Sequence, residues 1–463
     1  MQPNPLAPSW LSVPHDANAL APAVWSSNAA RSESGELTVA GVPASALAAE
    51  FGTPLYVVDE MDARGRARLI RESFDREFAR IGSSVKVYYA GKAFLSVEVA
   101  RWMIDAGLNI DACSGGELAV ALAAGAPAER LGLHGNNKSV REIDRAVGVG
   151  IGAIVLDSII EIERVAEAAT RHGRVQSVRL RVNSGVHAST HEFLATARED
   201  QKFGIPLTEV PEVVALIRSH ASLKFLGLHS HIGSQIFETD GFAEAARRLF
   251  DVHAELLAGG PVPELNLGGG FGIAYTSVDE AFPIDELAAR FADIVAAAAE
   301  RLGVPIPVLA IEPGRAIIGN AGHTLYEVGT IKDVLVEGTA VRKYVSVDGG
   351  MSDNIRPALY GADYSARLAN RSSDAEPALV RVAGKHCESG DIVVHAEYLP
   401  ADVTPGDLLA VPATGAYCWS MASNYNYLGR PPVVAVRDGV ARVLVRGETE
   451  EDLLRRDAGL DAS

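Results

Sequence analysis

The chain has 463 residues, of which 48% are hydrophobic and 22% are charged, as in globular proteins of two or three domains. Its formal net charge of -17 argues against binding to nucleic acids or to anionic membrane surfaces, because both require basic patches. The first 40 residues show neither a signal peptide nor a membrane anchor, and we expect a cytoplasmic protein. A reducing compartment is also favoured by the three widely spaced cysteines, Cys113, Cys387 and Cys418.

The N-terminal part of the chain is predicted to form two segments. Residues 1–34 contain scattered Pro, Ser and Asn, and we expect them to be loosely ordered. Residues 35–58 contain short hydrophobic runs, including Leu55, Tyr56, Val57 and Val58, which favour strands. We expect these strands to join a second domain that the C-terminal part of the chain forms.

The central part of the chain alternates short hydrophobic runs with amphipathic stretches. Helical spacing of hydrophobic residues is seen, for example, at 94–106 and 242–257. Eight candidate strands can be counted, at 85–89, 108–112, 130–134, 152–156, 177–182, 223–229, 264–267 and 306–311. Eight such units predict an α/β fold, a TIM-like (β/α)8 barrel, over residues 59–316.

The C-terminal part of the chain changes to strands and turns. Strands are predicted at 324–336, 343–347, 378–382, 391–396, 407–411, 433–436 and 441–445. The last two flank Asp438-Gly439, which is a strong signal for a hairpin turn. Residues 317–463 are therefore predicted to form an all-β domain, a barrel or a sandwich.

Lys92 lies where the first barrel strand ends. Chemistry in such barrels gathers at the carboxyl ends of the strands, and lysine forms Schiff bases with aldehydes. The alternative is a solvated loop lysine. Against this alternative, the other seven strand ends also carry polar or glycine residues, which a purely structural rim would not need: Ser114 to Gly116, Asn136, Asp157, Asn183, His231 with Ser234, Gly268 to Gly270, and Glu312 to Arg315.

Three consecutive glycines, Gly268, Gly269 and Gly270, follow the seventh strand. Their N–H groups can surround a small anion, and barrels frequently bind phosphate after strands seven and eight. Arg315 adds a planar set of donors suited to phosphate or carboxylate. A glycine-rich turn without a ligand is the alternative.

Glu312 follows the eighth strand, and Pro313 and Gly314 fix a tight turn beside it. A carboxylate that faces a pyridine nitrogen keeps the nitrogen protonated and strengthens an electron sink. The alternative is a surface salt bridge.

His229 and His231 resemble a metal-binding pair, but no third ligand lies at a useful spacing, so no metal site is predicted. We instead expect the His231 ring to stack on a planar cofactor, with Ser234 donating to a phosphate. His229 is expected to be a buried histidine with satisfied hydrogen bonds.

Short motifs follow one another along the chain: Tyr-Ala-Gly-Lys-Ala at 89–93, Ser-Gly-Gly-Glu-Leu at 114–118, His-Gly-Asn-Asn-Lys at 134–138, Lys-Phe-Gly-Ile at 202–205, His-Ile-Gly-Ser-Gln at 231–235, Gly-Gly-Gly-Phe-Gly at 268–272, Glu-Pro-Gly-Arg at 312–315, Cys-Glu-Ser-Gly-Asp at 387–391 and Gly-Ala-Tyr at 415–417. With these motifs, the chain resembles the fold-type III, alanine-racemase-like decarboxylases that use pyridoxal phosphate. Within them it is most similar to the diaminopimelate decarboxylases, from about residue 53 to 428.

The resemblance implies a role for each matching residue. Lys92 is the covalent attachment point of pyridoxal 5'-phosphate, His231 stacks on its ring, and Glu312 pairs with its pyridine nitrogen. The residues implied to hold the phosphate or touch the cofactor are Ser234, Gly268, Gly269, Gly270, Gly314, Arg315 and Tyr417. The residues implied to hold the substrate are Arg315, Arg356, Tyr360, Glu388 and Tyr417.

The resemblance also implies an obligate head-to-tail homodimer, in which the loop with Cys387 and Glu388 enters the active site of the partner subunit. The implied reaction converts meso-2,6-diaminopimelate into L-lysine and carbon dioxide, the last step of bacterial lysine biosynthesis. Cys387 is the first candidate for the acid that protonates the substrate carbon, and Lys92 is the second.

Three other functions are less well supported. Ornithine, arginine and carboxynorspermidine decarboxylases share the barrel motifs, but Arg356 and Tyr360 favour a substrate with an amino acid at both ends. Racemases are better served by a cation at the pyridine nitrogen than by Glu312. A non-catalytic regulatory relative that binds a partner protein would lose Lys92 or the phosphate loop, and both are intact.

Overall fold

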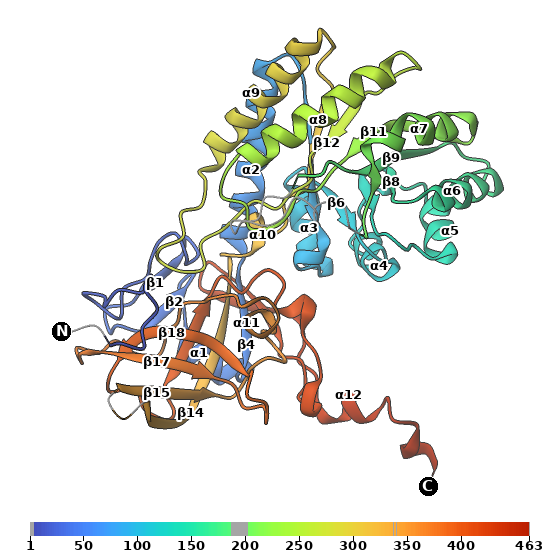
Figure 1. The fold of residues 1–463 in the computed structure, drawn as a ribbon. Coiled ribbons are helices and arrows are strands. Elements are labelled where there is room, and N and C mark those ends of the chain that lie inside the picture. Colours follow the sequence, from blue (N-terminus) through green and yellow to red (C-terminus); the bar gives the residue numbers. More distant parts are fainter. Residues whose placement is uncertain (1–3, 187–201, 337, 339, 463) are drawn as a thin grey trace. The chain divides into compact units, whose positions relative to one another are not determined.

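The computed structural model describes residues 4–186, 202–336, 338 and 340–462, and Figure 1 shows its elements along the chain. The chain divides into two compact units. One, which we call the β unit, comprises Met1–Ala63, Ile273–Ala281 and Ile317–Ser463, and the other, the barrel unit, comprises Arg64–Gly272 and Phe282–Ala316. The predicted barrel range 59–316 thus includes a segment of the β unit, where Ala274 lies in the hydrophobic core.

The barrel unit contains a closed ring of eight parallel strands. The ring closes because β8 pairs with β9 and β13 pairs with β5, and a short strand β10 (Ile205–Pro206) adds to β9. This confirms the predicted barrel, with strand boundaries that differ by a few residues at most. The strands are β5 (Val85–Ala90), β6 (Asn109–Ala112), β7 (Leu131–Leu133), β8 (Ala153–Leu156), β9 (Gln176–Asn183), β11 (Leu223–His229), β12 (Glu264–Asn266) and β13 (Val308–Ile311).

Helices follow the barrel strands, as the sequence pattern predicts. The side chain of Ser96 accepts a hydrogen bond from the Val99 N–H and so caps α3, whose Trp102 and Met103 are buried. Among the described residues, no helix is long and apolar enough to cross a membrane. The helices are α2 (Glu60–Arg80), α3 (Val97–Asp105), α4 (Gly115–Ala123), α5 (Val140–Val149), α6 (Ile159–Arg171), α7 (Val210–Ser219), α8 (Asp240–Leu257), α9 (Ile284–Leu302) and α10 (Arg315–Ile318).

An aromatic cluster fixes the chain just after the three glycines. The ring of Phe271 lies 5.8 Å from Phe242 of α8 and 5.6 Å from Phe291 of α9, measured between centroids. Phe74 of α2 lies 6.3 Å from Phe271. Such buried rings contribute large apolar areas, so they hold the glycine segment against the helices.

The β unit is built on a mixed sheet. Strand β4, from the N-terminal part of the chain, pairs antiparallel with β14 and parallel with β20, which confirms that the C-terminal β domain takes up N-terminal strands. Its elements are β1 (Ala29–Arg31), β2 (Leu37–Val39), β3 (Val42–Pro43), α1 (Ala44–Phe51), β4 (Leu55–Asp59), β14 (Gly322–Val336), β15 (Ala340–Val347), α11 (Arg356–Tyr360), β16 (Arg367–Leu368), β17 (Pro377–Ala383), β18 (Ile392–Pro400), β19 (Leu408–Pro412), β20 (Val433–Arg437), β21 (Val440–Val445) and α12 (Glu450–Leu454).

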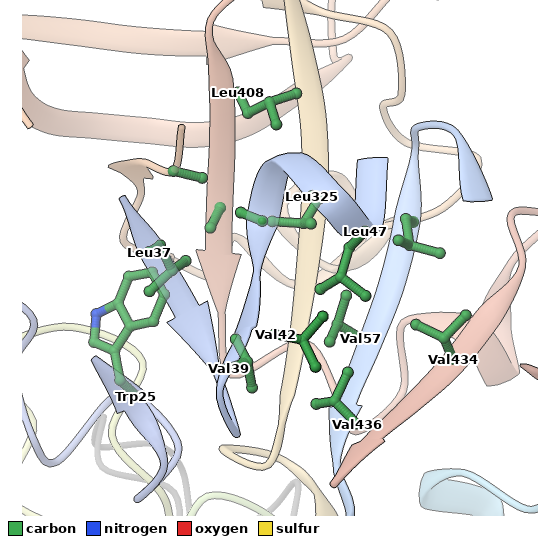
Figure 2. Close-up of a cluster of buried hydrophobic side chains, with 14 of the residues drawn as sticks. Trp25, Leu37, Val39, Val42, Leu47, Val57, Leu325, Leu408, Val434 and Val436 are labelled. Atoms are coloured by element: carbon green, nitrogen blue, oxygen red, sulfur yellow. The ribbon is translucent and has the colours of Figure 1, made fainter. Parts of the chain in front are cut away.

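The core of the β unit unites segments that are far apart in the sequence. Figure 2 shows Leu47 of α1, Val57 of β4 and Leu325 of β14 pointing toward one another. Trp25 belongs to the same cluster and is 2% exposed, and its ring stacks on His323. Ordered structure therefore begins within the range 1–34 that was expected to be loosely ordered, because an isolated buried tryptophan leaves no periodic pattern in the sequence.

The predicted hairpin near the C-terminus is confirmed. Strands β20 and β21 are joined by Asp438 and Gly439, both with positive φ angles of 50° and 77°. Two left-handed residues in succession give the turn whose twist matches that of the flanking strands.

Candidate active site

Lys92 lies directly after β5, in the single helical turn Gly91–Ala93. Its side chain is exposed, whereas Gly91 and Ala93 on either side are buried. A Cβ at Gly91 would lie 3.0 Å from the carbonyl oxygen of Asp111, so the turn packs tightly on the neighbouring strand β6. The strand end thus presents one accessible amine on a fixed backbone.

Glu312 lies at the end of β13, and its carboxylate is a hydrogen-bond acceptor inside the barrel. His229 Nε2 lies 3.0 Å from Oε1, and Asn266 Nδ2 donates to the same oxygen at 2.6 Å. Burial by itself would raise the pKa of the Glu312 carboxyl, but His229 and His134 outweigh burial and hold it well below its usual range. Glu312 is therefore a buried anion.

His134, His229 and Glu312 form a group whose possible ligand atoms all lie within 4.8 Å of one another. The sequence spacing did not reveal this third partner of His229. Oε1 of Glu312 accepts a hydrogen bond from Asn266, and Oε2 forms a hydrogen bond with His229 Nε2 at 3.2 Å. We interpret the group as a hydrogen-bonded network around one carboxylate, because each of its two oxygens already has a partner.

Gly268, Gly269 and Gly270 form a close-packed cradle. A Cβ at Gly269 would lie 2.1 Å from the Glu312 carbonyl oxygen, and one at Gly270 would lie 2.2 Å from that of Gly233. Within the described residues, the N–H groups of Gly269 and Gly270 have no hydrogen-bond acceptor. Free N–H groups at the end of the seventh strand fit a phosphate.

Arg315 and Ser234 adjoin each other in the barrel unit. The NH2 group of Arg315 donates to Ser234 Oγ at 2.9 Å, and Arg315 is buried. Gly314 lies against β5, because a Cβ there would be 3.0 Å from the Ala90 carbonyl oxygen and from the Ala93 Cβ. This contact brings the chain after β13 next to the turn with Lys92.

His231 lies just beyond the end of β11, whose last residue is His229. Its Nδ1 atom would be 3.0 Å from a Cβ at Gly268 and, within the described residues, has no hydrogen-bond partner. Burial and the charge of Lys92 lower the pKa of His231 to about 3. A neutral imidazole beside the glycine cradle can stack on a planar ring.

Arg356 begins helix α11 in the β unit, and it is 6% exposed. Its guanidinium donates to the Tyr364 hydroxyl and lies 4.6 Å from the centroid of the Tyr275 ring. Burial opposes the charge, but Tyr364 and Tyr275 outweigh burial and raise the pKa of Arg356 above its usual value. Tyr360, at the other end of the helix, is 65% exposed.

The Cys387–Glu388 loop joins β17 to β18. The Asp391 carboxylate accepts hydrogen bonds from the N–H groups of His386 and Met351 at 2.7 and 2.6 Å. His386 Nε2 lies 2.8 Å from Ser352 Oγ. These bonds anchor the loop on both sides of Cys387 and Glu388, whose side chains are exposed. Tyr417, in the loop after β19, is half-buried and has a φ angle of 66°.

Sequence reasoning missed several polar residues inside the barrel. Asp111, His134 and Asn266 surround Glu312, and His229, expected to be only a buried histidine, bonds to it directly. The available signal was a polar side chain within a hydrophobic strand, since burial of a charged group requires a partner.

Comparison with known proteins identifies the family. Residues 67–319 match the family described as pyridoxal-dependent decarboxylase, pyridoxal binding domain. A diaminopimelate decarboxylase from Mycobacterium tuberculosis is 53% identical over 443 residues, which cover 94% of this chain and 98% of that protein. The chain belongs to the diaminopimelate decarboxylase family.

Another member of the diaminopimelate decarboxylase family, from Bacillus subtilis, is 45% identical over 431 residues, covering 92% of this chain and 96% of that protein. The crystal structure of diaminopimelate decarboxylase from M. jannaschii in co-complex with L-lysine has a TM-score of 0.86 and 31% identity, covering 93% of this chain and 98% of that one. The family and fold predicted from the motifs are thus confirmed. As a pyridoxal-dependent decarboxylase, the chain offers residues that fit the cofactor: an accessible lysine, a buried anion and unpaired cradle N–H groups.

Proposed function

We propose that this decarboxylase converts meso-2,6-diaminopimelate into L-lysine and carbon dioxide, with pyridoxal phosphate attached to Lys92. The observation that carries the proposal is the arrangement of strand ends in one barrel. Lys92 follows β5, the cradle follows β12, and the buried anion Glu312 follows β13. The relatives support the substrate, because those 43 to 53% identical are named diaminopimelate decarboxylases.

Pyridoxal phosphate, when bound, supplies an electron sink for the electron pair that carbon dioxide leaves behind. Glu312 would keep a proton on the pyridine nitrogen, because its carboxylate is anionic and buried. His231 would stack on the face of the pyridine ring. Its imidazole is uncharged, so it would not compete for the proton on the ring nitrogen. These two side chains make the sink effective.

The glycine cradle and Arg315 would hold the phosphate of the cofactor. Gly269 and Gly270 offer N–H groups that no acceptor in the described part of the chain occupies, and the guanidinium of Arg315 is oriented by its hydrogen bond to Ser234. Backbone donors on a packed loop need no rearrangement to bind an anion, so they position the ring with little loss of entropy. Only glycine permits this approach, since a Cβ at either position would collide with a backbone carbonyl.

Substrate binding and proton delivery depend on the β unit. We assign Arg356 to a substrate carboxylate, because its charge is held by tyrosines and has no acidic partner in the hydrogen bonds and ion pairs of the described residues. Tyr360, Glu388 and Tyr417 complete the substrate contacts. Cys387, exposed on an anchored loop, is the proposed acid that protonates the substrate carbon in the partner subunit of a homodimer.

The test compares carbon dioxide release from meso-diaminopimelate and from ornithine by the wild type, Lys92→Ala and Lys224→Ala. Lys224 is an exposed lysine on β11, away from the strand's carboxyl end, and serves as the control. We expect release from meso-diaminopimelate by the wild type and the control only. Borohydride reduction followed by peptide mass analysis should place the cofactor's mass on the peptide with Lys92.

Faster release from ornithine than from meso-diaminopimelate would overturn the substrate assignment. A wild type that carries no cofactor on Lys92 after reduction, and releases no carbon dioxide from either amino acid, would overturn the enzymatic proposal itself.

A further inference from the structure

Asp111 is a buried carboxylate without a conventional partner. It lies in β6, is 3% exposed, and neither of its oxygens has a hydrogen bond within the described residues. The structure makes room for it, because a Cβ at Gly132 of β7 would lie 2.3 Å from Asp111 Oδ1. A glycine inside a strand weakens the strand, so the space for this carboxylate comes at a structural cost.

His134 lies between two carboxylates. Its Nε2 atom is 3.2 Å from Asp111 Oδ1 and 3.5 Å from Glu312 Oε1. Its ring also meets that of His229 edge-on, with centroids 5.1 Å apart. A single N–H at His134 Nε2 cannot form a good hydrogen bond to Asp111 and to Glu312 at the same time. The protonation states of Asp111, His134 and Glu312 therefore depend on one another.

We propose that Asp111 and His134 are positioning residues that hold Glu312 against the pyridine nitrogen of pyridoxal phosphate and keep it anionic. This inference rests on the proposed function. Glu312 has donors of its own in His229 and Asn266, whereas among the described residues the one ion-pair contact of Asp111 is with His134. The proton that the two acids share therefore resides on the Asp111–His134 pair, and the negative charge resides on Glu312.

The electrostatic environment supports the same distribution. Burial raises the pKa of Asp111 above its usual value, while that of Glu312 is held low. A neutral Asp111, or an ion pair of Asp111 with a charged His134, costs less inside the barrel than two bare carboxylates. Loss of His134 would remove one neighbour that favours the Glu312 anion and one contact of its Oε1 atom.

The experiment measures how much of the cofactor's affinity depends on its ring nitrogen. Full-length protein freed of cofactor is titrated with pyridoxal phosphate and with its 1-deaza analogue, which has carbon in place of the ring nitrogen. The variants are His134→Leu and Asp111→Leu, each paired with a polar replacement, His134→Gln and Asp111→Asn. His253→Leu is the control, because His253 is a buried barrel-unit histidine that packs on Phe250, outside this network.

We expect the wild type to prefer pyridoxal phosphate over the analogue. In the two leucine variants this preference should fall about tenfold, the loss expected when a charge-assisted hydrogen bond is weakened. The polar replacements should restore most of it, and His253→Leu should keep it. If His134→Leu does not fold, Asp111→Leu and Asp111→Asn provide the same comparison.

A leucine variant that binds both compounds more weakly by equal factors would show a merely structural role and overturn the proposal. An unchanged preference would also overturn it, with the proposed function intact. A wild type that binds the two compounds equally, with no cofactor fixed on Lys92 by reduction, would instead contradict the proposed function on which the inference rests.

Discussion

Gly269 and Glu312 touch backbone to backbone. A methyl group at Gly269 would lie 2.1 Å from the Glu312 carbonyl oxygen and 2.7 Å from its carbonyl carbon. The neighbouring Gly268 accepts the Glu312 N–H at 2.9 Å. These contacts between the ends of β12 and β13 therefore position both the proposed phosphate cradle and the backbone of Glu312, whose carboxylate is proposed to face the ring nitrogen.

Replacing Gly269 with alanine should disturb both ends of the cofactor. Backbone atoms cannot turn away as a flexible side chain can, so Gly269→Ala has to shift one of the two strand ends. We expect the dissociation constant for pyridoxal phosphate to rise at least about tenfold, as for the loss of one charge-assisted hydrogen bond. Titration of the cofactor-free protein by absorbance measures this change.

Gly65→Ala is the matched control for that experiment. Gly65 is an exposed residue within α2, and a Cβ there would meet nothing within 4 Å. The substitution should leave cofactor affinity unchanged and stabilise the helix by roughly 0.5–1 kcal/mol. Equal cofactor affinity of Gly269→Ala and the wild type would show that the cradle does not hold the phosphate.

A shared active site predicts complementation between two inactive variants. Lys92→Ala removes the proposed cofactor anchor, and Cys387→Ala removes the proposed acid from the partner's site. In a mixed dimer, one of the two sites then contains both an intact Lys92 and an intact Cys387. Equal mixing with free exchange should restore about one quarter of wild-type activity, because half of the dimers are mixed and each has one good site.

Carbon dioxide release before and after co-refolding or co-expression measures this recovery. Each variant mixed with itself is the control. No recovery, in a mixture whose subunits are shown by native mass spectrometry to have exchanged, would place Lys92 and Cys387 in the same subunit's site.

The sequence predicted the barrel well because its strands are short and mostly buried. All four residues of β8, Ala153–Leu156, are buried, which is why a plain run of apolar letters was sufficient. Lys92 and Glu312 were also predicted, since their positions after strands place them at one end of the barrel whatever the details of packing.

Interior partners were harder to predict because they depend on contacts between strands. Asp111, His134 and Asn266 belong to three different strand ends, and only closure of the ring brings their side chains around Glu312. Trp25 was missed for the same reason. Its burial depends on strands almost 300 residues away, and no local periodicity marks it.

Arg356 should determine whether a carboxylate at the substrate's distal end is recognised. In Arg356→Met the side chain keeps an unbranched apolar stem and loses the charged guanidinium. We expect the KM for meso-diaminopimelate to rise about tenfold to a hundredfold, the range for a hydrogen-bonded charge pair of about 1.5–3 kcal/mol. Inhibition by 1,5-diaminopentane, which has no carboxylate, should be unchanged.

Tyr364→Phe provides the matched control for Arg356, because it removes only the hydroxyl group that accepts from the guanidinium. Its effect on KM should be smaller than that of Arg356→Met. If 1,5-diaminopentane binding weakened as much as diaminopimelate binding, Arg356 would act through the structure of the β unit instead of through a carboxylate.

His323 should make the β unit sensitive to acid. It is fully buried, stacks on Trp25 and lies 3.0 Å from Ser26 Oγ, and burial lowers its pKa from 6.5 to about 4. The unfolded chain therefore binds a proton more readily than the folded one, so this histidine's contribution to stability is complete above pH 6.5 and is lost as the pH falls toward 4. At pH 5 the loss is about 2 kcal/mol. Thermal unfolding at pH 7 and pH 5 should show a larger drop in stability for the wild type than for His323→Gln. The glutamine amide can still bond to Ser26 but does not titrate. Equal drops in the two proteins would show that His323 stays uncharged in both the folded and the unfolded state, or is already charged in the folded state.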